Sequence, residues 1–203
     1  MRIGEQEREE VAAAIRMAEA MTSGEIFCVH ARSSDDYRHI PLLWAALVAL
    51  LLPAPLIPFT WWPVQTVYLA QLAAFAALAL ACSWRPLRIR LVPGSLKRRR
   101  AHRHALEQFL AHGLHTTEGR TGVLIFVSQA ERYAEVVADE AIYRKVEPAV
   151  WDEAVAALVA AAREGRPAKG FVQAIAICAE VLAKHFPPAK DDRDELPNRL
   201  VEL

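Results

Sequence analysis

Hydrophobic and polar positions along this 203-residue chain follow three kinds of pattern. Gln6 to Met21 carries apolar residues at helical spacing, with glutamates near its start, and predicts an amphipathic helix. Glu25 to Ala31 and Gly122 to Ser128 are short, almost continuously apolar runs, which are typical of buried strands. The third pattern is an apolar stretch from Ile40 through Trp84 without Asp, Glu, Lys or Arg.

The remaining pattern completes a small α/β domain. Leu96 to His112 predicts a helix, and Tyr133 to Ala138 predicts a strand that pairs antiparallel with Gly122 to Ser128. Asp139 to Val146 fits either a short helix or a continuation of the strand. Helices follow from about Pro148 and over Ala168 to His185. This order predicts a three-layer α/β domain with a mixed sheet whose first two strands are parallel.

The uncharged stretch is long enough for two membrane spans. A span needs about 20 apolar residues, which Ile40 to Phe59 and Val64 to Trp84 each supply. Prolines cluster from Pro53 to Pro63, where the first span ends and the chain reverses, and Trp61 and Trp62 stand where a headgroup belt is expected. The alternative is a helical hairpin buried in a soluble core, but a chain of this length has little mass with which to cover it. We therefore expect a transmembrane helical hairpin.

Basic residues flank the uncharged stretch and set its expected orientation. Arg32 and Arg38 precede it, and a denser group follows it: Arg85, Arg88, Arg90, Lys97, Arg98, Arg99, Arg100 and Arg103. Lys and Arg near span ends are retained on the cytoplasmic side. The polar start, MRIGEQEREE, lacks the basic flank and apolar core of a signal peptide. We expect a multi-pass protein of the inner (cytoplasmic) membrane with both soluble parts in the cytoplasm.

Four segments follow from these patterns. Residues 1–39 form the first part of the α/β domain, 40–84 the transmembrane hairpin, 85–186 the second part of the domain, and 187–203 a polar C-terminal tail. The 24 basic and 24 acidic residues balance, so no net field indicates a nucleic-acid partner. The three cysteines show no disulfide or zinc spacing.

Four motifs in order resemble one known family. TSGEI at Thr22 to Ile26, RTGVLIFVS at Arg120 to Ser128, YAEVVADEAI at Tyr133 to Ile142 and LAKHFP at Leu182 to Pro187 are similar to the TPM domain, especially to a bacterial branch in which two membrane spans interrupt the domain. The resemblance covers nearly all of the chain outside the hairpin. It implies the TPM-like fold, and some plant relatives are described as calcium-binding acid phosphatases. The chain departs from the pattern after Asp139, where relatives usually place a glycine.

The edge of the sheet opposite the hairpin is the candidate site. Because strands one and two are expected to be parallel, their amino ends and the end of antiparallel strand three share that edge. It gathers Glu25, Asp139 and Glu140. Carboxylates in irregular segments suit hard cations, so these three residues are predicted metal ligands for Ca²⁺ or Mg²⁺. The alternative is a helix cap at Ser23 or Asp139 and a solvated carboxylate at Glu25.

Two further groups of residues are weaker candidates. The basic run Lys97 to Arg103 suits contact with anionic membrane lipid. It lacks the interleaved aromatic residues that stack bases, which argues against nucleic acid. The seven histidines lack metal-ligand spacing, so we expect exposed or interfacial rings. There is also no nucleophile elbow, phosphate-binding glycine loop, HExxH or CxxC pattern.

Two functions remain in competition. The first is a membrane-anchored TPM-like domain that acts as an interaction, assembly or maintenance factor for a membrane complex, with a protein partner. The second is a divalent-metal-dependent phosphatase acting through Asp139 and Glu25. A homo-oligomeric scaffold is a further possibility, since the alanine-rich stretch Leu72 to Ala81 allows close helix packing between copies.

Overall fold

The computed structural model describes residues 3–188 and 195–203, with the backbone alone at residues 85 and 86. The chain divides into two compact units. One contains Met1–Ser34 together with Arg98–Leu203, and the other contains Asp35–Lys97. The boundaries enclose the predicted hairpin and add the short segments that lead into and out of it.

The first unit is built on a four-stranded sheet. Its strands are β1 (Glu25–Ala31), β2 (Gly122–Ser128), β3 (Tyr133–Ala138) and β4 (Leu200–Glu202), in the spatial order β3-β2-β1-β4. β1 and β2 run parallel from Glu25 opposite Gly122, and β2 and β3 run antiparallel. These pairings confirm the predicted mixed sheet. β1 and β2 are buried along their whole length, as their continuous apolar runs predict.

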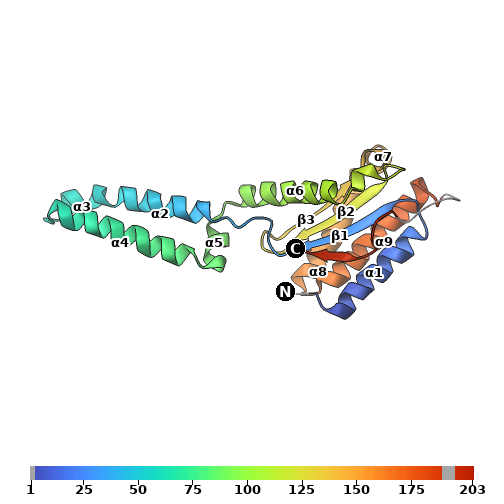
Figure 1. Cartoon of the computed structure of the whole chain (residues 1–203), viewed down its shortest axis with the longest axis horizontal. Helices are drawn as coiled ribbons and strands as arrows, with labels where there is room; N and C mark the ends of the chain where they lie inside the picture. The colour runs from blue at the N-terminus through green and yellow to red at the C-terminus, as the bar shows by residue number, and fades with distance from the viewer. Residues whose placement is uncertain (1–2, 189–194) are drawn as a thin grey trace. The chain divides into compact units, whose positions relative to one another are not determined.

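Helices cover both faces of this sheet (Figure 1). One face packs against α1 (Glu5–Glu19), α8 (Pro148–Arg163) and α9 (Pro167–His185). The other packs against α6 (Gly94–Ala111) and the 3₁₀ turn η1 (Leu114–Thr116). Alternation along β1 divides the two cores, since Ile26 and Cys28 face the three-helix layer, whereas Phe27 and Val29 face α6. Three layers were predicted, and three are present.

The short helix α7 (Glu140–Tyr143) resolves the alternative that the sequence left open. Asp139 is its N-cap residue and accepts a hydrogen bond from the Glu140 N–H. The Asp139 N–H in turn donates to the Gly122 carbonyl at 2.9 Å, which continues the β2–β3 ladder by one bond. The strand therefore ends at the residue that starts the helix.

The end of the chain departs from the prediction. Residues 187–203 were predicted to be a polar tail, and this is wrong for β4, which pairs parallel with β1 at Cys28 to His30. Leu200 is buried, and the Arg32 N–H donates to the Leu203 carbonyl at 2.9 Å. A three-residue strand is too short to give an alternation signal, and only the neighbouring β1 makes it a strand. Residues 189–194 of the predicted tail lie outside the described part of the chain.

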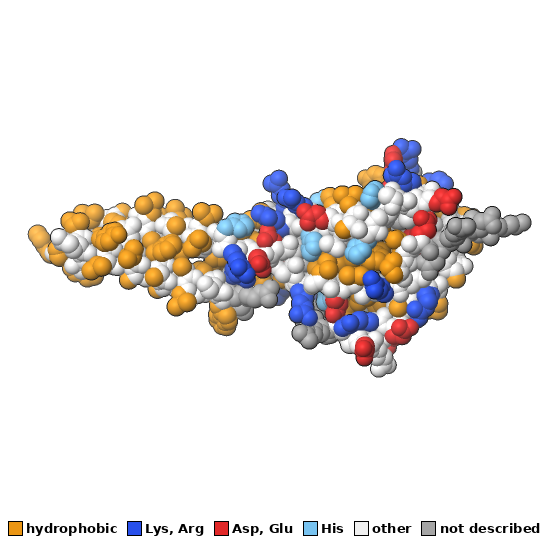
Figure 2. Space-filling view, in the orientation of Figure 1, with side chains coloured by type: hydrophobic (Ala, Val, Ile, Leu, Met, Phe, Trp, Pro, Cys, Tyr) orange, Lys and Arg blue, Asp and Glu red, His pale blue; other side chains and the backbone are white. Residues whose placement is uncertain are grey.

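The second unit is a helical hairpin. Its first arm is α2 (His39–Leu51) continued by α3 (Pro53–Phe59), its second arm is α4 (Val64–Cys82), and the short helix α5 (Arg85–Leu91) follows. Both arms are long and apolar enough to cross a membrane. Ala45 and Ala49 of α2 and Val67 of α4 are buried, while most large apolar side chains of the hairpin are exposed. Figure 2 shows these hydrophobic side chains gathered over α2, α3 and α4.

Candidate functional site

Two of the three predicted metal ligands flank one glycine at the amino-terminal edge of the sheet. Glu25 is the register partner of Gly122, and the Asp139 N–H donates to the Gly122 carbonyl from the other side. Side chains alternate along strands, so Glu25 and Asp139 belong to the same face as Phe27 and Val137, the face that α6 covers. Strands β1 and β3 are two spacings apart, about 10 Å. The predicted location of Glu25 and Asp139 at one edge of the sheet is therefore confirmed.

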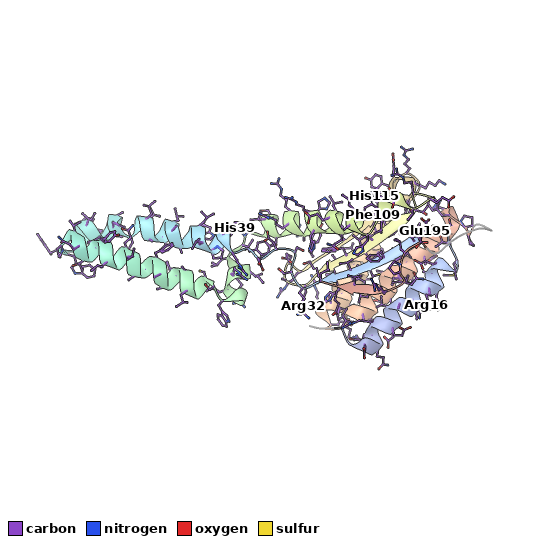
Figure 3. The ribbon with its side chains drawn as sticks, in the orientation of Figure 1. Arg16, Arg32, His39, Phe109, His115 and Glu195 are labelled. Carbon is purple, nitrogen blue, oxygen red and sulfur yellow. The ribbon has the colours of Figure 1, made fainter. Side chains whose placement is uncertain are left out.

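The two carboxylates are held by backbone donors. Glu25 is 7 % exposed, and its Oε1 accepts a hydrogen bond from the Glu195 N–H at 3.2 Å. Glu195 is labelled in Figure 3. Asp139 is also 7 % exposed, and its Oδ1 accepts from the Glu140 N–H at 2.7 Å. Its other oxygen, Oδ2, is shielded from solvent and has no hydrogen bond within the described residues. That oxygen is a buried acceptor available to a ligand.

Glu140 does not join this pair. Its side chain is exposed and forms an ion pair with Arg144 one helical turn further on. Within residues 3–188 and 195–203, no three His, Cys, Asp or Glu side chains come together as a metal-binding group. The Ca²⁺ or Mg²⁺ site stays a prediction, and its geometry at this edge now rests on Glu25 and Asp139.

Gly122 is required where it stands. A Cβ on this residue would lie 2.4 Å from the Leu114 carbonyl oxygen, so the η1 turn rests directly on the strand. The backbone carbonyl therefore lies at the glycine that separates the two carboxylates. The Leu114 carbonyl also accepts a hydrogen bond from the Thr117 hydroxyl at 3.4 Å.

A second polar cluster, missed by sequence reasoning, lies at the opposite edge. Glu131 is 8 % exposed and accepts hydrogen bonds from the Ser34 N–H at 3.1 Å, the Ser33 hydroxyl at 3.2 Å and the Ser128 hydroxyl. The Ser34 hydroxyl donates to the Ser128 Oγ at 2.9 Å. This network ties the segment that leaves β1 to the β2–β3 turn. The available signal was the serines that end or follow the two parallel strands.

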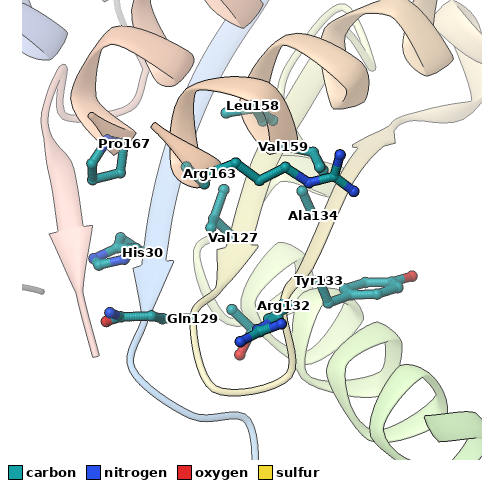
Figure 4. Close-up of a pocket in the computed structure, with 12 residues that line it drawn as sticks. His30, Val127, Gln129, Arg132, Tyr133, Ala134, Leu158, Val159, Arg163 and Pro167 are labelled. Atoms are coloured by element: carbon teal, nitrogen blue, oxygen red, sulfur yellow. The ribbon is translucent and has the colours of Figure 1, made fainter. Parts of the chain in front are cut away.

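Beside this cluster is a groove of about 630 Å³. Its apolar side is formed by residues of β2, β3, α8 and the start of α9: Val127, Ala134, Leu158, Val159, Ala162 and Pro167. His30, Ser128, Gln129, Arg132, Tyr133 and Arg163 complete the lining. In Figure 4, Arg163 comes from α8 and Arg132 from the β2–β3 turn, with Val127 between them in this view. Its volume is that of a small-molecule site.

His30 forms the buried end of the groove. The residue is 3 % exposed, its ring packs edge-on to Phe171 with 6.4 Å between centroids, and its Nδ1 is 3.8 Å from Glu202 Oε1. Burial lowers the pKa of His30 below its ordinary value, although the Glu202 carboxylate opposes that shift. The ring is therefore mainly neutral at pH 7, and the positive charge of the groove comes from its arginines.

The histidines near α6 follow the interfacial interpretation. The His104 ring packs edge-on against Phe126, and the His112 ring lies 4.3 Å from Phe27, both on the α6 face of the sheet. His102 pairs with Glu135 at 2.8 Å. Each of these three rings has an aromatic or acidic neighbour on the sheet.

Comparison with known proteins shows a similar fold but indicates no activity. No protein-family model matches the chain, and no curated protein matches it. Its structure is similar to the NMR structure of BA42 protein from the psychrophilic bacterium Bizionia argentinensis, with 21% sequence identity and a TM-score of 0.63. The match covers 100% of this chain and 97% of that chain. The class defined by the fold and the edge site is thus a mixed α/β domain interrupted by an apolar helical hairpin.

Proposed function

We propose that the chain is a membrane-anchored, TPM-like α/β domain whose hairpin spans the bilayer, and that it serves as an interaction, assembly or maintenance factor for a membrane complex. The observation that carries the proposal is the exposed surface of the hairpin. Phe59, Val64 and Leu80 are 86 %, 82 % and 77 % exposed, although each is strongly apolar. A core helix of a soluble protein would be mostly buried, whereas lipid would cover such side chains at no cost.

The charge distribution supports insertion with both soluble segments on one side. The uncharged hairpin is preceded by Arg32 and Arg38 and followed by the basic segment of α5 and α6. Cytoplasmic retention of these flanks gives the orientation. The turn between the arms, Thr60 to Pro63, carries no charge to oppose its transfer across the bilayer.

The architecture also supports a role in presenting a surface. β1 comes before the hairpin in the chain and β2 after it, yet they pair along seven positions of one sheet. The domain is therefore joined to its anchor by two connections rather than one flexible tether. A doubly joined domain loses less freedom when it meets a membrane-bound partner, which favours assembly functions.

Cysteine labelling tests the insertion. The native thiols at Cys28, Cys82 and Cys178 are buried, so single cysteines introduced as Trp62→Cys in the turn and Ser95→Cys in the flank can be read against a low background. In intact cells, an impermeant maleimide is expected to label position 62 and to spare position 95 until the cells are opened. Labelling of position 95 from outside, or release of the protein by alkaline carbonate, would contradict the proposal.

Crosslinking tests the interaction role. With the protein in native membranes, we expect a reproducible partner whose capture survives substitution of the edge carboxylates, because an assembly surface does not need their chemistry. A protein that is recovered only as an uncomplexed monomer from crosslinked membranes would argue against an assembly factor.

The second candidate, a divalent-metal-dependent phosphatase, is favoured by the shielded Asp139 Oδ2 beside Gly122. Together with Glu25 it would supply oxygen ligands to Ca²⁺ or Mg²⁺. Calorimetric titration with each cation, and hydrolysis of a phosphate monoester, are compared for Asp139→Asn and Glu140→Gln. This candidate requires that Asp139→Asn abolish both signals and that Glu140→Gln, at an exposed ion-paired position, preserve them.

A further inference from the structure

The groove at the carboxyl ends of β1 and β2 is positively charged and has no acidic residue in its lining. Arg132 and Arg163 both line it, both are exposed, and neither has an ion pair or hydrogen bond to its side chain within the described residues. Their neighbour Arg166, by contrast, is paired with Glu164. Two guanidinium groups with free donors beside an apolar wall form a receptor for an anion that carries an apolar body.

Three carboxylates contact residues of the groove lining, and each has partners of its own. Glu135 accepts a hydrogen bond from the Tyr133 hydroxyl at 3.0 Å and pairs with His102 at 2.8 Å. Glu131 accepts three hydrogen bonds from Ser33, Ser34 and Ser128, and it is not part of the groove lining. Glu202 forms an ion pair with Arg8 at 3.3 Å and accepts from the Ile3 N–H at 3.2 Å. Within the described residues, none of these three carboxylates forms an ion pair with Arg132 or Arg163.

The backbone conformation at Arg132 makes glycine the appropriate test substitution. Its φ is 52°, in the left-handed region where glycine is the favoured residue of a hairpin turn. An arginine at this position costs folding free energy that a glycine would not, so Arg132→Gly removes the guanidinium without destabilising the turn. The guanidinium that it supplies to the groove is the one feature that glycine would lack.

We propose that this groove binds an organic phosphate, with its phosphoryl group bound by Arg132 and Arg163, whose exposed side chains turn toward it on binding, and its apolar substituent against Val127, Val159 and Pro167. Two arginines match the double negative charge of a phosphate monoester, and a guanidinium donates in pairs to phosphoryl oxygens. Gln129 and the neutral His30 add polar contacts without adding charge. The phosphate could be carried by a soluble molecule or by a lipid headgroup, and the chemistry recognised is the same.

Calorimetric titration of the full chain in dodecyl maltoside tests this with phenylphosphonate. Its P–C bond cannot be hydrolysed, so any phosphatase chemistry at the opposite edge cannot consume it. We expect saturable binding by the unaltered chain, and a loss of affinity of at least about tenfold in Arg132→Gly and in Arg163→Gln. Inorganic phosphate, which lacks the apolar body, is expected to bind more weakly than phenylphosphonate.

The chain offers a matched control. Arg120 also has a left-handed φ, 51°, but it precedes β2 at the other edge of the sheet. Arg120→Gly should relax the same backbone conformation and leave phenylphosphonate affinity unchanged. Arg132→Gly should unfold at a temperature no lower than the unaltered chain, which separates loss of binding from loss of fold.

Competition between phospholipids and phenylphosphonate distinguishes the two sources of the phosphate. If adding phosphatidylglycerol to the micelles weakens phenylphosphonate binding while phosphatidylcholine does not, an anionic lipid headgroup is the occupant. Equal binding in both assigns the groove to a soluble organic phosphate. Absence of phenylphosphonate binding at millimolar concentration, or equal affinity in Arg132→Gly, Arg163→Gln and Arg120→Gly, would overturn the proposal. These outcomes are independent of membrane insertion, because every lining residue belongs to the α/β unit.

Discussion

Replacing Gly122 by alanine is the sharpest perturbation of the candidate edge site. The new Cβ would lie 2.4 Å from the Leu114 carbonyl oxygen and 3.0 Å from the carbonyl carbon. Both are backbone atoms, so no side-chain rotation relieves the overlap, and either η1 or β2 must move. β2 is the neighbour of both β1 and β3, and it is buried throughout. Because its neighbours hold β2 in place, we expect η1 to move away from Gly122.

The magnitude follows from the cost of overpacking a closely packed interior. One inserted methyl group typically costs about 1–3 kcal/mol, and a contact with backbone belongs at the upper end of that range. For a domain of this size, about 2–3 kcal/mol lowers the unfolding temperature by roughly 5–10 °C. Gly122 lies between Glu25 and Asp139 in the sheet, so any cation affinity of this edge should fall in parallel.

Thermal unfolding followed by circular dichroism in detergent measures the effect. Gly94→Ala is the control, because nothing lies within 4 Å of a Cβ at that position, at the start of α6. It is expected to change stability by no more than about 1 kcal/mol, in the stabilising direction. Equal unfolding temperatures for Gly122→Ala and the unaltered chain would refute the close approach of η1 to β2.

Three further predictions address the hairpin, the last strand and pH. Leu72→Arg places a charge near the middle of α4 at a cost of about 3–4 kcal/mol for insertion, so alkaline carbonate should release this variant from the membrane fraction. Leu106→Arg, at an exposed position of α6, is the control and should stay in the membrane fraction. Equal retention of the two variants would contradict the span. Deleting residues 200–203 removes β4 and buried Leu200 and should lower the free energy of unfolding in urea by about 2–4 kcal/mol; an unchanged midpoint would show that the β1 edge does not need this strand. His30 has a folded-state pKa below its ordinary value of 6.5, so the unfolded chain binds the proton first and stability should decline as pH falls below about 6.5. His30→Gln should flatten that decline between pH 5.5 and 7, and an identical slope in both proteins would mean that another group is responsible.

The secondary structure was readable where local pattern and tertiary environment agree. Glu25–Ala31 and Gly122–Ser128 are continuous apolar runs because helices cover both faces of the central strands, and burial on both sides leaves no polar alternation. The two helical arms of the hairpin were also predicted from the sequence, because an apolar run of about 20 residues is the length of a membrane-spanning helix. The parallel pairing of β1 with β2 followed from the order of elements.

The candidate site was only half readable. Topology alone brought Glu25 and Asp139 to one edge, but Glu140 turns to Arg144 because the helix that starts at Asp139 rotates the next side chain outward. The groove lined by Arg132 and Arg163 had no sequence signal, since residues of β1, β2, β3, α8 and α9 meet there only after the sheet and its helices have packed.

The sequence by itself determined the elements and the uncharged hairpin, because each depends on neighbours within a few turns of chain. The order of the elements then indicated the pairing that brings Glu25 and Asp139 to one edge. Tertiary structure alone decided that Leu200–Glu202 is a strand, that Gly122 has no room for a side chain, and that Ser34, Ser128 and Glu131 form one network. Each of these features depends on atoms that come from distant positions in the chain. Strand pairing, the close approach of η1 to β2 and the buried hydrogen bonds therefore exist only in the packed sheet.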